Sequence, residues 1–225
     1  MIGENTSEIL KQLPSEVKLV AVSKFHPLES VLEAYAAGQR YFAESRPQEF
    51  QKKVLALDEM QHPAASDIEW HFIGHLQTNK LKMVLPYASL IQSVDSLHLL
   101  DEINSWGKAN GKVINVLLEL HIGAEETKQG FVEEDVLDIL FRADKFKNIR
   151  FCGLMGMASH TDNDDDVRAD FARISDYMEY LKDLFPELED FKELSIGMSG
   201  DWQIALEYGA TMVRIGTAIF GERQY

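Results

Sequence analysis

Eight short apolar runs, separated by segments with helical spacing, constrain the fold of this 225-residue chain more than any other feature. Several runs are almost continuously hydrophobic, which is typical of parallel strands covered on both faces. We therefore expect a strand at each of them. The runs span 17–22, 40–43, 69–73, 89–94, 113–120, 149–157, 193–196 and 211–215.

The segments between the runs carry apolar residues at helical spacing, most clearly in 28–36, 132–143 and 167–185. Weaker patterns predict helices at 44–58, 77–85, 96–109 and 201–208, and we expect an additional helix at 4–13. Strands that alternate with helices, without a linker, indicate a parallel α/β fold. Eight equivalent units favour a (β/α)8 TIM barrel that forms a single domain over residues 1–225, and an open doubly wound sheet is the alternative.

The composition limits the partners and the compartment. A formal net charge of -15 argues against nonspecific nucleic-acid binding and against binding to anionic membrane surfaces, because both need an excess of Lys and Arg. The single cysteine, Cys152, excludes an intramolecular disulfide, and its apolar surroundings indicate a buried structural thiol. We find no signal peptide and no apolar stretch long enough to span a membrane. The sequence thus predicts a cytoplasmic protein. We see no additional apolar stripe that a partner subunit could cover, so we expect a monomer.

Small residues follow the last two expected strands, in SIGMSGDW (195–202) and VRIGTAIFG (213–221). Ser199-Gly200 and Gly216-Thr217 each lead directly into an expected helix start. Glycine lets the backbone approach an anion, and helix N–H groups and hydroxyls can donate to it. Barrels often bind a phosphate after strands 7 and 8, so these loops predict a phosphate site, although either loop alone is compatible with an ordinary turn. We expect Asp201 to face away from the anion and to stabilise the first helical turn.

Arg214 lies inside an apolar strand, on the same face as Met212 and Gly216. It points either into the helix layer, where it needs a carboxylate partner, or into the barrel mouth. The sequence leaves both orientations open.

Lys24 lies at the end of the first expected strand, in KLVAVSKFHP, which is where barrels carry their active sites. A lysine becomes nucleophilic when desolvation or a nearby cation such as Arg214 keeps it neutral, and it then forms imines. An amine beside a phosphate pocket suggests a phosphorylated carbonyl compound, either a sugar phosphate or pyridoxal 5′-phosphate. The arginine bears on the choice, because a pyridine nitrogen needs a partner and a sugar phosphate does not.

Six motifs resemble the pyridoxal-phosphate homeostasis proteins (YggS/PROSC type), which are relatives of the barrel domain of alanine racemase. The resemblance runs in order from about residue 17 to the C-terminus. The motifs are AVSK (21–24), FAES-x-x-QE (42–49), WHFIGHLQTNK (70–80), GLMGM (153–157), SIGMS (195–199) and MVRIGTAIFGER (212–223).

The resemblance implies that Lys24 holds pyridoxal 5′-phosphate as a Schiff base and that Arg214 faces the pyridine nitrogen. It also implies that Ser199, Gly216 and Thr217 bind the phosphate. Two methionines would lie near the cofactor, Met198 against it and Met155 as a weaker candidate. Family members usually read FGEN where this chain has FAES, so the shorter Ser45 takes the place of an asparagine that contacts the ring in the family.

Amino-acid racemisation is the obvious alternative activity, but it needs an acid/base on each face of the ring. In alanine racemase a second, β-rich domain contributes a tyrosine for the opposite face. This chain ends at Tyr225, soon after the last strand, and we see no substitute. An arginine at the ring nitrogen also disfavours pyridine protonation, so the ring is a poorer electron sink.

We therefore expect a carrier or regulator of intracellular pyridoxal phosphate with little or no turnover, which passes the cofactor to apo-enzymes. A weak pyridoxal-phosphate enzyme that acts on amino acids, such as a racemase, is one alternative. An imine-forming sugar-phosphate lyase is the other.

Three further features have a structural or a functional interpretation. His71 and His75 lie too far apart on a strand to share a metal ion, so we expect a packed barrel histidine and a mouth residue beside the cofactor. TDNDDD (161–166) lacks the glycine and glutamate spacing of a calcium loop and indicates a solvated helix start. HIGAEETKQG (121–130), with Glu125, Glu126 and Lys128, is either a solvated loop or a lid over the ring.

Overall fold

The computed structural model describes residues 1–123 and 129–222. Its eight strands pair in parallel and in chain order, and β8 pairs back onto β1 to close a barrel. This confirms the barrel prediction and excludes the open sheet. The strands are β1 (Lys18–Val22), β2 (Tyr41–Glu44), β3 (Glu69–Phe72), β4 (Leu90–Val94), β5 (Ile114–Glu119), β6 (Ile149–Met155), β7 (Glu193–Ser195) and β8 (Met212–Ile215).

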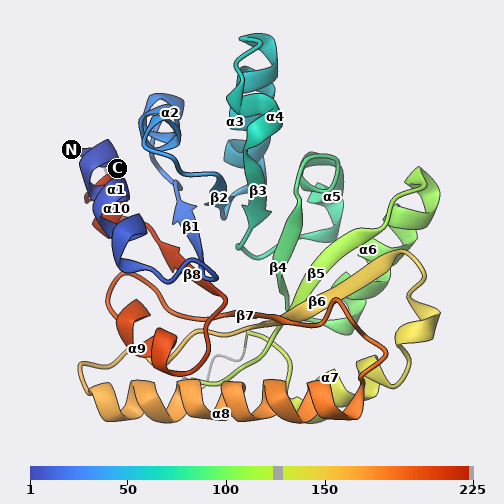
Figure 1. The fold of residues 1–225 in the computed structure, drawn as a ribbon. Coiled ribbons are helices and arrows are strands. Elements are labelled where there is room, and N and C mark those ends of the chain that lie inside the picture. Colours follow the sequence, from blue (N-terminus) through green and yellow to red (C-terminus); the bar gives the residue numbers. More distant parts are fainter. Residues whose placement is uncertain (124–128, 223–225) are drawn as a thin grey trace.

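Helices follow the strands and surround the barrel (Figure 1). The expected helix at 77–85 is a 3-10 turn followed by one α-helical turn. The single turns α4 and η2 were not predicted, because one turn is too short to show a helical period. The helices are α1 (Ile2–Gln12), α2 (Leu28–Ala36), α3 (Pro47–Glu59), α4 (Ala64–Asp67), η1 (Thr78–Lys80), α5 (Leu81–Val84), α6 (Leu97–Asn110), α7 (Glu133–Leu140), η2 (Ala143–Lys145), α8 (Asp164–Leu184), α9 (Trp202–Glu207) and α10 (Thr217–Phe220).

The acidic run before α8 is a helix start, as expected. Asn163 is the N-cap, and its side chain accepts a hydrogen bond from the Asp165 N–H. The carboxylates of Asp164, Asp165 and Asp166 lie in the first turn, where the helix dipole favours negative charge.

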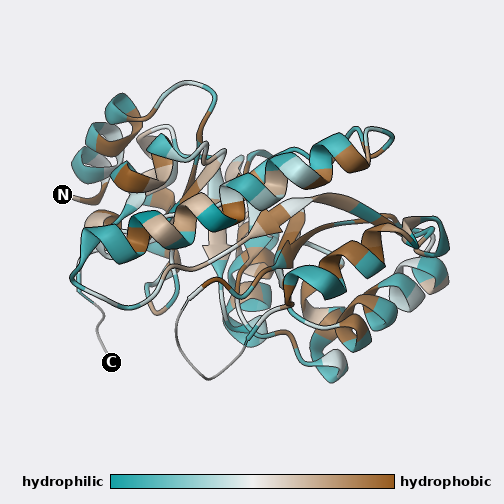
Figure 2. Ribbon diagram, turned by 90° about the horizontal axis from the view of Figure 1, so that it is seen from below, coloured by the Kyte–Doolittle hydropathy of each residue, from teal (hydrophilic) through white to brown (hydrophobic). Residues whose placement is uncertain are grey.

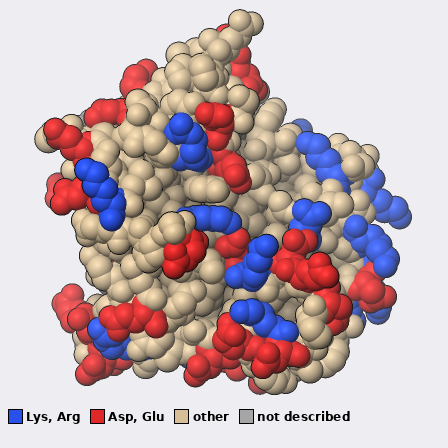
Figure 3. Space-filling model, in the orientation of Figure 1, with Lys and Arg blue, Asp and Glu red and all other residues tan. Residues whose placement is uncertain are grey.

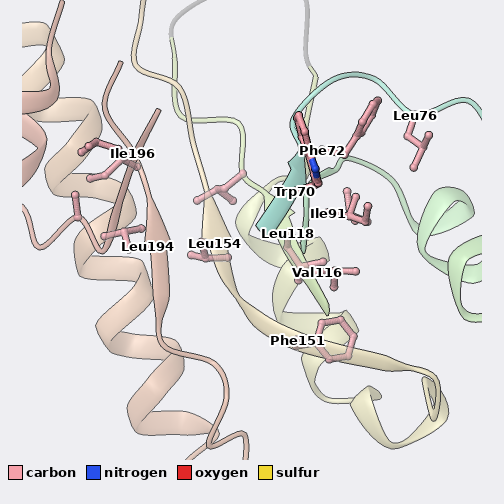
Figure 4. Close-up of a cluster of buried hydrophobic side chains, with 14 of the residues drawn as sticks. Trp70, Phe72, Leu76, Ile91, Val116, Leu118, Phe151, Leu154, Leu194 and Ile196 are labelled. Atoms are coloured by element: carbon pink, nitrogen blue, oxygen red, sulfur yellow. The ribbon is translucent and has the colours of Figure 1, made fainter. Parts of the chain in front are cut away.

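Strand alternation divides the core into two layers. The larger layer lies between the strands and the helices, and it includes Val116 and Leu118 of β5 together with Leu154 of β6 (Figure 4). The smaller layer fills the barrel and includes Leu117 of β5 and Met155 of β6. Along the helices, hydrophobic and hydrophilic residues lie on different sides of the ribbon (Figure 2).

A β-bulge in β6 sets which of its residues face the barrel interior. The pairing with β5 shifts from Val116–Phe151 to Leu117–Gly153, so Cys152 is the additional residue. Gly153 has a φ of 145°, and a Cβ there would lie 1.9 Å from the Glu193 carbonyl oxygen, so only glycine fits.

Cys152 is half-buried rather than fully buried as expected, because the bulge displaces it from the regular alternation. Burial, and secondarily Asp190, raises the pKa of its thiol to about 11. The thiol is therefore protonated at neutral pH, which agrees with the predicted structural role.

On the face shown in Figure 3, Lys and Arg side chains are interspersed with Asp and Glu and form no continuous basic patch. Among the described residues, no helix has the length and apolar character needed to cross a membrane.

Candidate functional site

The Lys24 turn, which comprises Ser23, Lys24 and Phe25, follows β1 and lies between the ends of two neighbouring strands. β1 pairs with β2 on one side and with β8 on the other. Lys24 is half-buried there. The loop at Gly216 packs on the end of β1, since a Cβ on this glycine would lie 3.2 Å from the Val22 carbonyl oxygen. The Lys24 turn and the start of α10 therefore meet at the C-terminal end of the barrel.

A buried ion pair ties the Lys24 turn to β2 and α3. Lys53 Nζ lies 2.5 Å from Glu44 Oε1 and donates to the Ser23 carbonyl oxygen at 2.8 Å. Ser23 Oγ donates to the same Glu44 oxygen at 2.6 Å. Burial raises the pKa of Glu44, and Lys53 and Ser23 partly offset this rise. The residue before Lys24 is thus held by both its backbone and its side chain.

The residue after Lys24 is held as well. The Phe25 N–H donates to Glu49 Oε1 at 2.7 Å, and the Arg46 guanidinium lies 4.3 Å from the centre of the Phe25 ring. Phe25 has a φ of 67°, which non-glycine residues rarely adopt and which persists only where surrounding contacts impose it. Lys24 is consequently fixed between two anchored neighbours.

The loops after β7 and β8 are joined to each other. The Gly216 N–H donates to Ser199 Oγ at 3.3 Å, where α10 begins. Thr217 is the first residue of α10 and is exposed. Helix α1 packs against α10 (Figure 1), and Asn5 Nδ2 of α1 donates to the Ile219 carbonyl oxygen of α10 at 3.1 Å. The two loops that the sequence assigned to a phosphate are therefore adjacent.

Asp201 is the N-cap residue of α9, but its side chain makes no capping hydrogen bond. It accepts a hydrogen bond from the Met198 N–H instead. The carboxylate thereby closes the loop that follows Gly197, whose φ is 91°. Met198 lies on this loop with 38% of its surface exposed.

Arg214 lies inside the barrel and not in the helix layer, which settles the orientation that the sequence left open. Its Nη1 donates to the backbone oxygen and to Oγ of Ser195, both at 2.7 Å, and its Nη2 donates to the Gly156 carbonyl oxygen at 2.9 Å. Burial lowers the pKa of Arg214 to about 10, and Glu119 and Asp201 oppose this change. The guanidinium is therefore still charged at neutral pH.

A chain of hydrogen bonds continues from Arg214 across the barrel. Ser195 Oγ donates to Gln92 Oε1 at 2.7 Å, and Gln92 Nε2 donates to His71 Nδ1 at 2.8 Å. Burial, and secondarily Lys18, lowers the pKa of His71 to about 3, so its imidazole is neutral. The expectation of a packed barrel histidine is confirmed. His75 is exposed, and its Nδ1 lies 3.0 Å from Asp95 Oδ2.

Glu119 ends β5 and is buried, although the sequence reading gave it no role. Burial and the nearby charge of Asp95 raise its pKa to about 7, against the opposing effect of Arg214 and His75. Glu119 and Gln92 could have been noticed as polar residues within apolar runs, in VLLEL and LIQSV. Ser195, Glu44 and Lys53 gave no comparable signal.

A cavity of about 250 Å³ opens beside these strand ends, and Glu119, Ile122, Met157 and Met198 contribute to its lining. Met155 is buried in the barrel interior instead. A larger hollow of about 630 Å³ lies near Val113 and Ile149, at the opposite ends of β5 and β6. We assign it no role in the site, because it is remote from the Lys24 turn.

The candidate residues gather at one end of the barrel, on five strands that are neighbours in the order β6, β7, β8, β1 and β2. Each lies on one of these strands, in the loop that follows it or, for Thr217, at the start of the next helix. The set is Lys24, Ser45, Met155, Met198, Ser199, Arg214, Gly216 and Thr217. The expected lid residues Glu125, Glu126 and Lys128 lie outside the described residues.

The family model of the alanine racemase N-terminal domain matches residues 1–224. Among curated relatives, the pyridoxal phosphate homeostasis protein of Aquifex aeolicus is 39% identical over 92% of this chain and 88% of its own. The human protein of the same name is 39% identical over all of this chain and 85% of its own. The chain belongs to the pyridoxal phosphate homeostasis protein family.

Solved structures with the same fold resemble this chain. PipY of Synechococcus elongatus PCC7942, in its structure with PLP bound, is 34% identical, with a TM-score of 0.88 over 98% of this chain and 100% of PipY. An alanine racemase of Clostridium difficile is 16% identical with a TM-score of 0.75, covering all of this chain and 56% of the racemase. That likeness shows the barrel fold alone.

Proposed function

We propose that this chain binds pyridoxal 5′-phosphate as a Schiff base on Lys24 and serves as a carrier in intracellular vitamin B6 homeostasis, with little or no turnover. The single barrel domain would act as a monomer and pass the cofactor to apo-enzymes. The main observation behind the proposal is that the Lys24 turn and the Gly216 loop lie next to each other at the barrel end where the buried, charged Arg214 is found. The curated relatives are named homeostasis proteins rather than enzymes, which supports the assignment.

The residues at the strand ends suit this cofactor. It supplies an aldehyde that condenses with an amine, and it carries a phosphate and a pyridine ring. Ser199 Oγ, Thr217 Oγ1 and the N–H groups at the start of α10 are the donor types that hold a phosphate, and Gly216 lets the backbone come close. Arg214 would face the pyridine nitrogen, and Met198 the ring, with Met155 and Ser45 as further contacts.

The surrounding side chains position the amine rather than move protons on a substrate. Glu44, Lys53 and Glu49 fix the backbone on both sides of Lys24. Arg214 is a cation that already donates to Ser195 and Gly156, so beside the pyridine nitrogen it would disfavour protonation of the ring. Both features favour holding the cofactor over catalysis.

One observation favours the second candidate, a weak enzyme that acts on amino acids. Glu119 lines the cavity beside the site and has a pKa of about 7, so it can exchange a proton near neutral pH. The carrier proposal predicts that this capacity does not lead to turnover.

Two assays with the loaded protein test the proposed function. In the first, an apo pyridoxal-phosphate enzyme should regain activity on mixing with the wild-type protein. Lys24→Ala should give no such recovery, and Lys52→Ala, at an exposed helix position, serves as the matched control. In the second, L- and D-amino acids in deuterated water should show no α-proton exchange above the level of free cofactor. Rapid exchange in the wild-type protein would replace the carrier proposal with the enzyme.

A further inference from the structure

The cavity at the C-terminal ends of β5, β6 and β7 has apolar walls and one buried acid. Its volume is about 250 Å³. The residues that line it include Glu119, His121 and Ile122 from β5 and its loop, Met157 and Ala158 after β6, and Met198 after β7.

Glu119 gives this cavity a chemical preference. Only 6% of its surface is exposed, and within residues 1–123 and 129–222 no group donates a hydrogen bond to its carboxylate. A buried carboxylate without a donor is costly, so a ligand that brings donors and a positive charge gains affinity there. An ammonium group brings both, with three N–H donors.

The charges that face Glu119 come from several elements, and none of those in the described part of the chain forms an ion pair with it. Asp95, after β4, adds a second negative charge, and His75, after β3, is occupied with Asp95 at 3.0 Å. Arg214 of β8 is the opposing cation, but it donates its hydrogen bonds to Ser195 and Gly156. His121 lies on the cavity wall itself.

We propose that this cavity binds a small primary amine, whose ammonium group hydrogen-bonds to Glu119 while its apolar part lies against Ile122, Met157 and Ala158. The bound pair stays an ammonium–carboxylate ion pair, because an alkylammonium is a far weaker acid than Glu119. The use of this site, holding an amine beside an aldehyde at Lys24, rests on the proposed function. The binding itself does not.

Isothermal titration of the full chain with n-butylamine tests the binding, after any bound aldehyde has been removed with hydroxylamine. Because Glu119 ionises near pH 7, we expect about tenfold tighter binding at pH 8 than at pH 6. n-Butanol, which has the same length without the charge, should bind much more weakly. Absence of n-butylamine binding at pH 8 would overturn the inference.

Two variants locate the ligand. Glu119→Gln keeps the shape and should weaken binding about tenfold at pH 8 and remove the pH dependence. Ala158→Leu keeps the acid and fills the cavity, so it should also weaken binding, whereas Asp138→Asn on the exposed face of α7 should not. Wild-type affinity in either cavity variant would place the amine elsewhere and contradict the proposal. Since no cofactor is present, these results are independent of whether Lys24 binds an aldehyde.

Discussion

Arg214, Gln92 and Glu119 are polar side chains on largely apolar strands, and all three are buried. Arg214 and Gln92 belong to one hydrogen-bonded chain through Ser195, whereas the Glu119 carboxylate faces the cavity. Burying such groups opposes folding unless they are paired, so they contribute specificity and chemistry rather than stability. Glu119 and Arg214 each lead to a separate prediction about stability.

For Glu119, the prediction concerns pH. Its pKa is raised in the folded protein from 4.5 to about 7, so protonation stabilises the fold, fully below pH 4.5, and this contribution is lost as the pH rises through 7. The loss is about 3 kcal/mol in the free energy of unfolding. Urea unfolding at pH 5.5 and pH 8 should show this dependence in the wild-type protein and not in Glu119→Gln. An identical pH dependence in both proteins would argue against the raised pKa.

For Arg214, the prediction concerns its hydrogen bonds. Arg214→Met removes both hydrogen bonds to Ser195 and leaves the Gly156 carbonyl oxygen without the Arg214 donor, so it should lower the free energy of unfolding by about 2–4 kcal/mol. The exposed Arg150, paired with Asp190, is the control, and Arg150→Met should cost less than about 1 kcal/mol. Equal effects in the two variants would mean that the interior hydrogen bonds contribute little.

At the scale of elements, the ends of β1 and β2 are joined to α3 by one buried network. Glu44 and Lys53 are almost fully buried, and their contact also includes Ser23 of the Lys24 turn. Helix α3 therefore does more than cover the barrel, because its side chains fix the loop that carries the candidate lysine. A sequence pattern could predict the helix but not this contact, which depends on how α3 packs against the strand ends.

Removing one partner of the Glu44–Lys53 pair should lower the free energy of unfolding more than removing both charges. Lys53→Met leaves Glu44 buried without its cation and should lower the free energy of unfolding by about 3–5 kcal/mol. The double variant Lys53→Met with Glu44→Gln should recover most of this loss, since no buried charge remains. Urea unfolding of the two single variants and the double variant measures the coupling. If the double variant loses the sum of the two single effects, the residues do not act as a pair.

At the scale of the whole molecule, barrel closure brings together residues from opposite ends of the chain. Eight apolar runs with helical segments between them predicted the closed barrel, and pairing of β8 with β1 places Gly216 beside the Lys24 turn. The sequence could not predict the direction of Arg214. The alternation of side chains along a strand shows which residues share a face of the sheet, but not which face points into the barrel. The sequence also missed the back-turned Asp201 carboxylate and the role of Glu119, because both depend on contacts between different loops.

The central claim is that the amine of Lys24 bonds to the aldehyde of pyridoxal 5′-phosphate. The most direct test is borohydride reduction of the protein after incubation with this cofactor, followed by mass spectrometry of its peptides. We predict one pyridoxyl-modified peptide, containing Lys24, in the wild-type protein and in Lys52→Ala, and none in Lys24→Ala. Modification spread over other lysines, or absent from Lys24, would contradict the account.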